Sequence, residues 1–554
     1  MTDLLTEPQA LASVATNIEE LGSTITAANA AAASTISGLA PAAGDEVSEA
    51  IAKLFGAYGR EYQAVAGLAN AFHHEFTAAL AAAGSNYAAA ETGAQALLAG
   101  SPLTGNVVAV VMGGSGNPFP NGDYVSGVLR WAALNYTWNA EQTIFTPEGL
   151  YPLTGTKSLP LDVSVSQGIQ SLDATIKQQI ASGNSVLVQG YSQSTIIASL
   201  EMQNLMNPQI TPNPPAPNQL AFNLLADLMA PNGGLLARFP GLTLPSLGID
   251  FYGATPPNTP YTTNIYTIQY DGFADFPRYP IDIFSDLNAV AGIVEVHPLY
   301  PKMTFDLASS DVIQLPVQPG YTGNTTYYMV IPQNQILPLL APLHGIPVIG
   351  KPLVDLLQPD LTVLVNLGYG DPNYGYSTAP ANVPTPFGLF PHVSAGVIAA
   401  DLVRGAHQGV TAASHDIVVE ASGLLLPTSL PTISPPPHLA LTPASIDGFI
   451  NHLETVNTNV TNAFSQALST GYSTLLPTAD ILNAALISIP AYDVNLFLDG
   501  IAQALAGDPM GLINAIGYPI AATTGLLTVA GGVEALVLLG AVASIIKDFT
   551  GLIP

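Results

Sequence analysis

One segment constrains the fold of this chain more than any other: a short apolar strand that runs directly into a tight turn and then into a helix. Residues 185–189 have the character of a buried strand, residues 190–194 have the sequence Gly-Tyr-Ser-Gln-Ser, and residues 195–206 have helical spacing. At such a junction the central serine, Ser192, occupies a strained turn between closely packed elements. The pattern Gly-x-Ser-x-small also occurs in ordinary serine-rich turns. Its position between a strand and a helix is what makes Ser192 a candidate nucleophile.

The chain around this junction alternates between short apolar strands and helical stretches. Residues 107–112, 222–226 and 264–270 are strand candidates, and residues 164–182 have apolar side chains at helical spacing. Strands that alternate with helices form a parallel sheet covered by helices on both faces. The sequence therefore predicts an α/β domain over residues 106–390.

The first 92 residues differ in character and predict two long helices. Apolar residues recur every three to four positions on both sides of a break at residues 38–44, which contains Pro41. We expect an αα-hairpin over residues 1–92 and a Gly/Ala/Ser-rich linker at residues 93–105. Two helices cannot bury both apolar stripes, so a partner should cover them; a self-packed arm is the alternative.

Residues 391–554 are rich in alanine and leucine and predict a mostly helical region. Within it, residues 525–546 are nearly all apolar, with Glu534 as the charged exception. About 20 apolar residues are enough to span a bilayer, but the charge and several glycines favour a helix buried in the protein. We therefore expect a buried helix here, with a helix that spans the membrane as the alternative. Peripheral membrane or envelope association is a separate expectation for the protein as a whole.

Charge and cysteine content exclude several classes of function. The chain has 11 Lys+Arg against 39 Asp+Glu, a net charge of −28, which repels the phosphate backbone of nucleic acids. Cysteine is absent, which excludes disulfides, thiolate metal sites and a cysteine nucleophile. His73 and His74 have no neighbouring carboxylate pattern, and we expect no metal site there. The first residues lack a basic region followed by an apolar one, so we expect no cleaved leader.

A serine nucleophile of this kind needs a base and an orienting acid, which in α/β-hydrolases follow the serine in the order acid, then histidine. His297 is the first histidine after the strand candidate at residues 264–270, and we assign it as the base. The strand is followed by Tyr-Asp-Gly-Phe-Ala-Asp-Phe-Pro at residues 270–277. The spacing from the glycine and the proline that follows favour Asp275 as the acid, with Asp271 as the alternative.

Two groups of N–H donors are candidates for the oxyanion site. The N–H of Gln193 follows the candidate nucleophile at a helix N-terminus, where it would face the developing negative charge. A second donor is expected in the Gly-Gly-Ser-Gly turn at residues 113–116, from the backbone at Gly114 and Ser115 or from the Ser115 hydroxyl. Taken alone, a glycine-rich turn is more often only a turn.

The N-terminal region resembles the PE domain of mycobacterial PE proteins. Residues 1–92 have its two-helix layout, although Pro8-Gln9 stands where the name-giving Pro-Glu pair is expected. Tyr87 and Glu91 match the Tyr-x-x-x-Asp/Glu signal of type VII secretion substrates, which we expect just after the second helix.

Residues 106–390 resemble the PE-PPE domain, a cutinase-like serine hydrolase of the α/β-hydrolase fold. The matching pieces are Gly113–Gly116, Thr146–Glu148, Gly190–Ser194, Pro231–Gly234, Asp271–Pro277 and His297–Tyr300. Cutinases proper have glycine as the fifth residue of the serine turn and have disulfides; this chain has Ser194 there and no cysteine.

The resemblance implies that Ser192, His297 and either Asp275 or Asp271 form a catalytic triad. The implied reaction is hydrolysis of acyl esters or lipids through an acyl-enzyme, without a cofactor or metal. It further implies export by type VII secretion to the cell wall or outer envelope, with a PPE-family partner and a secretion chaperone bound through residues 1–92. Two other functions stay open: an acyltransferase that moves the acyl chain to a lipid or sugar hydroxyl, and a non-catalytic envelope or interaction protein.

Overall fold

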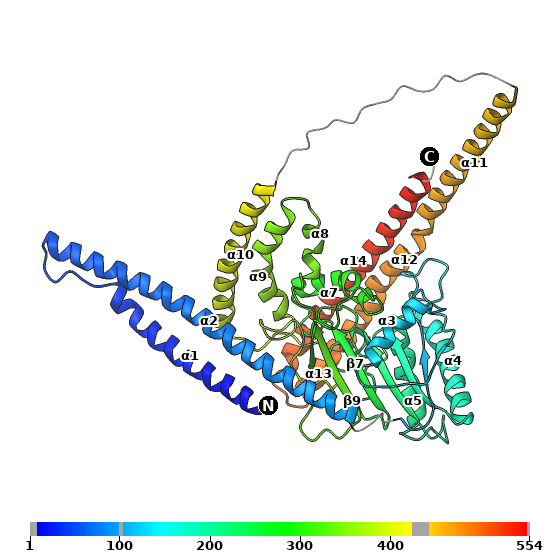
Figure 1. The fold of residues 1–554 in the computed structure, drawn as a ribbon, viewed down its shortest axis with the longest axis horizontal. Helices are drawn as coiled ribbons and strands as arrows, with labels where there is room; N and C mark the ends of the chain where they lie inside the picture. The colour runs from blue at the N-terminus through cyan, green and yellow to red at the C-terminus, as the bar shows by residue number, and fades with distance from the viewer. Residues whose placement is uncertain (1–7, 99–102, 424–442, 551–554) are drawn as a thin grey trace, which may run out of the picture. The chain divides into compact units, whose positions relative to one another are not determined.

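The computed structural model divides the chain into two compact units (Figure 1). The described residues are 8–98, 103–423 and 443–550. The smaller unit contains the N-terminal helices and a short strand, β8 (Asp311–Gln314); the larger unit begins at Pro102 and contains the central sheet and the C-terminal helices.

Two long helices, α1 (Pro8–Ser37) and α2 (Glu46–Leu98), pack against each other in the smaller unit, which confirms the predicted hairpin. The Tyr62 hydroxyl donates to Oδ1 of Asn29 at 3.0 Å, and Nε2 of His73 lies 2.6 Å from the carbonyl oxygen of Ile18. His73 is therefore engaged with the backbone of the opposite helix.

The second helix is longer than the sequence predicted. It continues to Leu98, so the first part of the expected linker at residues 93–105 is helical, and Tyr87 and Glu91 lie inside the helix and not after it. The run from residue 87 to residue 98 is dominated by alanine, the strongest helix former, and one interior glycine does not end it. The side chains of Tyr87 and Glu91 lie outside the described residues.

The larger unit is built on a parallel sheet. Its strands lie in the order β2-β1-β3-β4-β7-β9, and every neighbouring pair is parallel. The strands are β1 (Val107–Val111), β2 (Ala140–Thr143), β3 (Ser185–Tyr191), β4 (Leu220–Leu225), β7 (Thr262–Ile268) and β9 (Thr325–Ile331). A separate antiparallel pair is formed by β5 (Thr243–Leu244) and β6 (Ile249–Asp250).

Helices cover the sheet and extend from it. They are α3 (Gly122–Ala132), α4 (Leu161–Ala181), α5 (Gln193–Met206), α6 (Leu235–Arg238), α7 (Ile283–Glu295), α8 (Ala341–His344), α9 (Gly350–Leu367) and α10 (Ala395–Gly423). Every residue of β1, β3 and β4 is buried, so both faces of the sheet are covered. The predicted α/β fold is confirmed.

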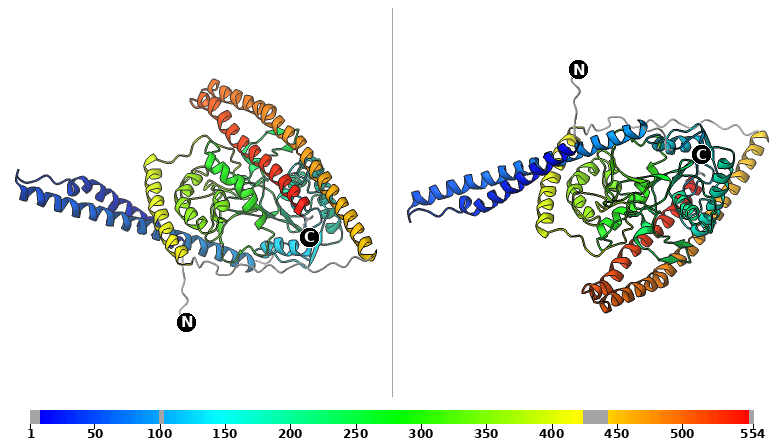
Figure 2. Two further views of the ribbon diagram at one scale, coloured as in Figure 1. Left: turned by 90° about the horizontal axis from the view of Figure 1, so that it is seen from above. Right: turned by 90° about the horizontal axis from the view of Figure 1, so that it is seen from below.

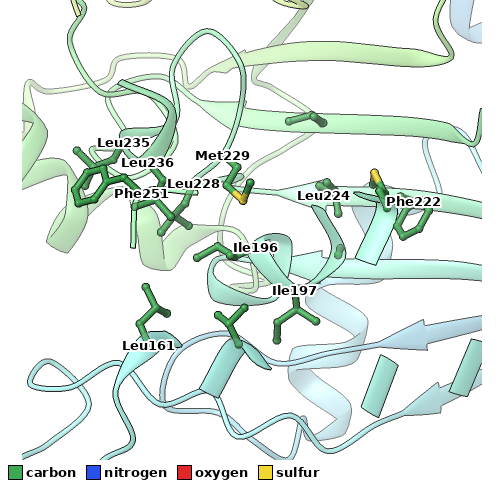
Figure 3. Packing of buried hydrophobic residues seen from close by; sticks show 14 of the residues in the cluster. Leu161, Ile196, Ile197, Phe222, Leu224, Leu228, Met229, Leu235, Leu236 and Phe251 are labelled. Atoms are coloured by element: carbon green, nitrogen blue, oxygen red, sulfur yellow. The ribbon is translucent and has the colours of Figure 1, made fainter. Parts of the chain in front are cut away.

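The core on one face of the sheet is packed from strands and helices that are distant in the chain (Figure 3). Ile196 and Ile197 of α5 lie between Leu161 of α4 and the β4 side chains Phe222 and Leu224. Burying each large apolar side chain contributes about 1.5–3 kcal/mol. This packing fixes α5 against the sheet and so fixes the turn that precedes it.

The C-terminal helices belong to the same unit as the sheet. They are α11 (Pro443–Ser473), α12 (Leu475–Asn483), a π-helical turn (Ala484–Ser488), α13 (Ile489–Leu505) and α14 (Gly511–Thr550). α14 packs against α7, α11 and α13. The orange and red helices of the C-terminal region lie side by side in Figure 2. Tyr492, Ala521 and Leu526 are part of the main hydrophobic core.

The expectation that residues 525–546 form a buried helix is wrong for most of that segment. They lie in α14, but Gly525 and Leu526 alone are buried among them, and Leu527, Leu539 and Ile546 are exposed. The first half of α14 lies against the core, whereas the second half extends beyond it. Two helical segments, Glu454–Leu505 and Gly511–Thr550, are long and apolar enough to cross a membrane.

Candidate active site

Ser192 stands at the end of β3 and at the start of α5, as its sequence context predicts. Its backbone has φ 59° and ψ −127°, a conformation that a residue other than glycine rarely adopts. Its side chain is buried. Strain of this kind at a strand-to-helix turn lifts a serine hydroxyl above the carboxyl edge of a parallel sheet.

Ser194 closes the turn with its side chain. Its hydroxyl accepts the N–H of Tyr191 at 2.9 Å and donates to the Tyr191 carbonyl oxygen at 3.0 Å. The ideal Cβ of a side chain at Gly190 would lie 3.2 Å from the carbonyl oxygen of Ser194, a tight contact that favours glycine at this position. Ser194 therefore has a structural role within the turn.

His297 connects Ser192 to a buried carboxylate. Its Nε2 lies 2.7 Å from Oγ of Ser192, and its Nδ1 lies 2.9 Å from both carboxylate oxygens of Asp271. Asp271 is completely buried, and His297 begins a 3-10 turn that is separated from the end of α7 by Val296. The structure thus brings together the predicted serine, the predicted histidine and the acid that was the alternative.

The preference for Asp275 as the orienting acid is wrong, because the turn after β7 reverses direction. The N–H of Asp275 donates to the carbonyl oxygen of Asp271 at 2.6 Å, and the Asp275 carboxylate returns to accept the N–H of Tyr270 at 3.0 Å. Burial raises the pKa of the Asp275 carboxyl well above its ordinary value, and the charge of Arg238 opposes that rise. Asp275 closes the turn from which Asp271 extends.

Aromatic side chains that the sequence analysis did not identify hold the histidine and its acid. The Tyr191 ring stacks on His297 with ring centres 5.3 Å apart, and its hydroxyl donates to the His297 carbonyl oxygen at 2.7 Å. The Tyr300 hydroxyl donates to Oδ2 of Asp271 at 2.9 Å. Phe273 meets the imidazole edge to face at 4.9 Å. Tyr300 stands three residues after His297 in His-Pro-Leu-Tyr, which is its sequence signal.

The glycine-rich turn after β1 is connected to Ser192 through the neighbouring glutamine. The Ser115 hydroxyl donates to Oε1 of Gln193 at 3.0 Å, and Nε2 of Gln193 donates to Oγ of Ser164 in α4 at 2.6 Å. The Ser115 hydroxyl is thus engaged with a side chain, and an oxyanion would depend on backbone N–H groups. Ser164 is a further site residue that the sequence analysis missed.

Gly114 lies against the aromatic ring that stacks on His297. A Cβ at this position would lie 2.8 Å from Cδ1 of Tyr191, so a larger residue would displace the ring. The glycine therefore allows the turn at residues 113–116 to approach the serine turn closely.

A buried glutamate, Glu148, supports the same turn from the other side. Its carbonyl oxygen accepts the N–H of Gly116 at 2.7 Å, and its carboxylate accepts a hydrogen bond from the Thr146 hydroxyl. Its Oε2 is buried without a hydrogen-bond partner. Burial raises the pKa of the Glu148 carboxyl from about 4.5 to about 8. Its sequence signal was the Thr146-Pro-Glu148 piece, to which the sequence analysis gave no role.

The described part of the chain contains no cluster of three or more histidines or carboxylates that could hold a metal ion. The side chains that the site brings together are a serine hydroxyl, an imidazole and a carboxylate. This set activates a nucleophile by proton transfer.

Two family models match the chain. The PE family model matches residues 4–94, and the PE-PPE domain model matches residues 138–370. The first lies in the helical hairpin, and the second includes Ser192, Asp271 and His297. None of the solved structures matches this chain.

Relatives in Mycobacterium tuberculosis resemble the chain over most of its length. An uncharacterized PPE family protein, PPE28, is 46% identical over 82% of this chain and 69% of its own. The PE family protein PE3 is 43% identical over 78% of this chain and 92% of its own. A protein named Esterase PE16 is 44% identical over 71% of this chain and 73% of its own. The chain therefore belongs to the mycobacterial PE family and carries a PE-PPE domain.

Proposed function

We propose that this protein is a serine carboxylesterase or lipase that hydrolyses acyl esters through an acyl-enzyme. The observation that carries the proposal is the continuous hydrogen-bonded series from Ser192 through His297 to Asp271, with distances of 2.7 and 2.9 Å. The 44% identity to a protein named Esterase PE16 supports it.

In the first half of the reaction, Oγ of Ser192 attacks the ester carbonyl carbon while Nε2 of His297 takes its proton. Asp271 accepts the Nδ1–H and stabilises the imidazolium that forms. The tetrahedral oxyanion would be held by the N–H of Gln193 and by the backbone of the turn at residues 113–116. The imidazolium then returns the proton to the leaving alkoxide, and an ester of Ser192 remains.

In the second half, His297 takes a proton from water, whose oxygen attacks the acyl carbon. Collapse of the second tetrahedral intermediate releases the carboxylic acid and returns the proton to Ser192. If a lipid or sugar hydroxyl replaces the water, the same steps transfer the acyl chain. The two outcomes therefore differ in the acceptor alone.

We further propose that the protein is exported by type VII secretion to the cell wall or outer envelope. The supporting observations are the helical hairpin and the Tyr87–Glu91 pair in its second helix. Several apolar side chains of the hairpin, including Leu21, Phe55 and Tyr58, are exposed. Such a surface is suited to a PPE-family partner and a secretion chaperone.

The decisive experiment measures hydrolysis of p-nitrophenyl esters of increasing chain length by the full chain. Removal of the nucleophile in Ser192→Ala should reduce kcat/KM by about 10³-fold or more. A fluorophosphonate probe should label the wild type and not the variant. Full activity of Ser192→Ala would overturn the mechanism, and absence of labelling with absence of activity would favour a non-catalytic protein. Product analysis with a long-chain alcohol present distinguishes hydrolysis from acyl transfer.

A further inference from the structure

The C-terminal helices α12, α13 and α14 expose many large apolar side chains on the side that does not enter the core. Leu505, Leu512 and Ile516 have exposed fractions of 85%, 61% and 66%, and it is the gathering of such side chains on adjoining helices that is informative. Val494, Leu498 and Leu505 follow one another at spacings of four and seven along α13, so they lie on one side of that helix. Leu512, Ile516 and Ile520 do the same on α14. We call these six residues the C-terminal apolar face.

The opposite side of the two helices is buried. Gly500 and Gly511 lie at the seam between them, where an added Cβ would come within 2.4 Å of Ala515 or Ala504 backbone atoms. Tyr492 of α13 and Leu526 of α14 enter the main core beside the sheet. The C-terminal apolar face therefore points away from the seam and from the body of the larger unit.

Acidic side chains of these helices turn inward. Asp480 accepts the Tyr151 hydroxyl, Asp493 accepts the Thr523 hydroxyl and Glu534 accepts the Thr478 hydroxyl, each at 2.6 Å. Asp499 and Asp508 stay exposed. No lysine or arginine occurs between Arg404 and Lys547. The face thus offers aliphatic surface without any basic group.

We infer that the C-terminal apolar face docks onto a neutral lipid surface. Aliphatic Leu, Ile and Val are the side chains that a hydrocarbon phase accepts, whereas protein interfaces concentrate their binding energy in Tyr, Trp and Arg. Two adjoining helical segments with mean hydropathies of 1.5 and 2.2 reach bilayer-crossing length. The absence of basic residues and the net charge of −28 exclude attraction to anionic headgroups.

The parts of α13 and α14 that carry the C-terminal apolar face lie along the lipid surface in this proposal. Ala521, Ala522 and Leu526 of α14 are buried in the main core, so the part of α14 next to them cannot enter a bilayer without leaving that core. A helix that buries one side in the protein and presents the other to lipid lies parallel to the interface.

The docked helices are linked to the region beside the candidate active site. Asp480 of α12 holds Tyr151, and Thr154 of the same segment lies within 3.5 Å of an ideal Cβ at Gly116. If the proposed esterase function holds, docking would bring lipid esters near the turn at residues 113–116. The docking itself does not depend on that function.

Flotation of the full chain with dioleoylphosphatidylcholine vesicles tests the inference. The wild type and Ser192→Ala should both float, and changing NaCl from 0.1 to about 1 M should have little effect, because the attraction is apolar. The triple variant Leu505→Asp, Leu512→Asp, Ile516→Asp should reduce vesicle binding at least tenfold, as three charges enter the hydrocarbon boundary.

The matched control is Met303→Asp, Val403→Asp, Val410→Asp, which adds the same charge at other exposed apolar positions of the larger unit. It should float like the wild type, and circular dichroism melting should show that both triple variants are folded. Equal loss of flotation in both would overturn the inference. Absence of flotation by the wild type would also overturn it. In that case, a wild-type dimer in sedimentation that the triple variant at Leu505, Leu512 and Ile516 dissociates would show that the face binds a second copy of the chain.

Discussion

The Tyr300 hydroxyl connects the carboxylate of Asp271 to the end of β7, the strand that precedes Asp271. It donates to Oδ2 of Asp271 at 2.9 Å and accepts the N–H of Ile268, the last residue of β7, at 2.6 Å. The hydroxyl therefore both donates and accepts a hydrogen bond, and the Tyr300 side chain is fully buried. This pair of bonds fixes the carboxylate that faces His297.

Replacement of Tyr300 by phenylalanine should leave the Asp271 carboxylate and the Ile268 N–H each with one hydrogen bond fewer. We expect kcat/KM to fall about tenfold, and the free energy of unfolding to fall by about 1–3 kcal/mol. Ester hydrolysis and urea unfolding measure the two effects. Tyr374→Phe, which changes a partly exposed tyrosine, is the control and should alter neither. Unchanged activity in Tyr300→Phe would show that Asp271 is held in place without this hydroxyl.

Substitution of Asp271 and substitution of Asp275 should have clearly different effects on kcat. Asp271→Asn removes the carboxylate that faces Nδ1 of His297 and should reduce kcat by about 10³–10⁴-fold. Asp275→Asn retains an oxygen that can accept the Tyr270 N–H, so its kcat should stay within about tenfold of the wild type. Steady-state hydrolysis of a short-chain ester measures both. The reverse order of the two variants would restore Asp275 as the orienting acid.

The buried Glu148 should make the protein less stable as the pH rises. Its pKa is raised by burial from about 4.5 to about 8, so between these values the folded state holds a proton that the unfolded state has lost. The free energy of unfolding should therefore decrease by about 1.4 kcal/mol per pH unit across this window from this group. Stability is fully retained below pH 4.5 and lost as the pH rises through 8.

The substitution Glu148→Gln isolates this contribution. The amide cannot ionise, so the difference in unfolding free energy between wild type and variant should change with pH between 5 and 8 and be constant above about 9. Urea unfolding at several pH values measures it. Asp227 and Glu201 also have pKa values raised by burial, to about 6 and 7, but they are common to both proteins and cancel. A difference that does not vary with pH would refute the assignment.

A methyl group at Gly114 should impair catalysis more than stability. Its Cβ would meet the Tyr191 ring at 2.8 Å and push it from the imidazole on which it stacks. We expect Gly114→Ala to reduce kcat/KM by about 10- to 100-fold, since a displacement near 1 Å at the reacting groups has effects of this size. Gly122→Ala, at an open position in the first turn of α3, should be nearly neutral. Comparable activities of the two variants would contradict the close packing at Gly114.

The sequence was sufficient to predict the sheet, the serine turn and His297, because each has a local signature. Strand residues 185–189 and helix residues 195–206 agree with β3 and α5 within a few positions. The acid was misassigned because spacing alone does not determine which way a tight turn sends two carboxylates. Only the reversal between residues 271 and 275 decides that Asp271 faces the histidine.

Two helix predictions failed for different reasons. The end of α2 was placed too early, because the alanines around Tyr87 and Glu91 continue the helix. The second half of α14 is exposed although its composition suits a protein interior. The hydropathy of a segment shows that its side chains could be buried, but burial also requires other elements of the protein to pack against it. Tyr191 and Ser164 were missed because their contacts join residues that are distant in the chain.

The main hydrophobic core beside the sheet includes side chains from the C-terminal helices: Ile489, Tyr492, Ala521 and Leu526. A fragment that ends at residue 390 would lack these side chains and would leave their neighbours beside the sheet in contact with water. With each large side chain worth about 1.5–3 kcal/mol, the loss is comparable to the whole stability of a typical domain. The sheet around Ser192 and the helices α13 and α14 therefore share one core, and the C-terminal helices are an integral part of the larger unit.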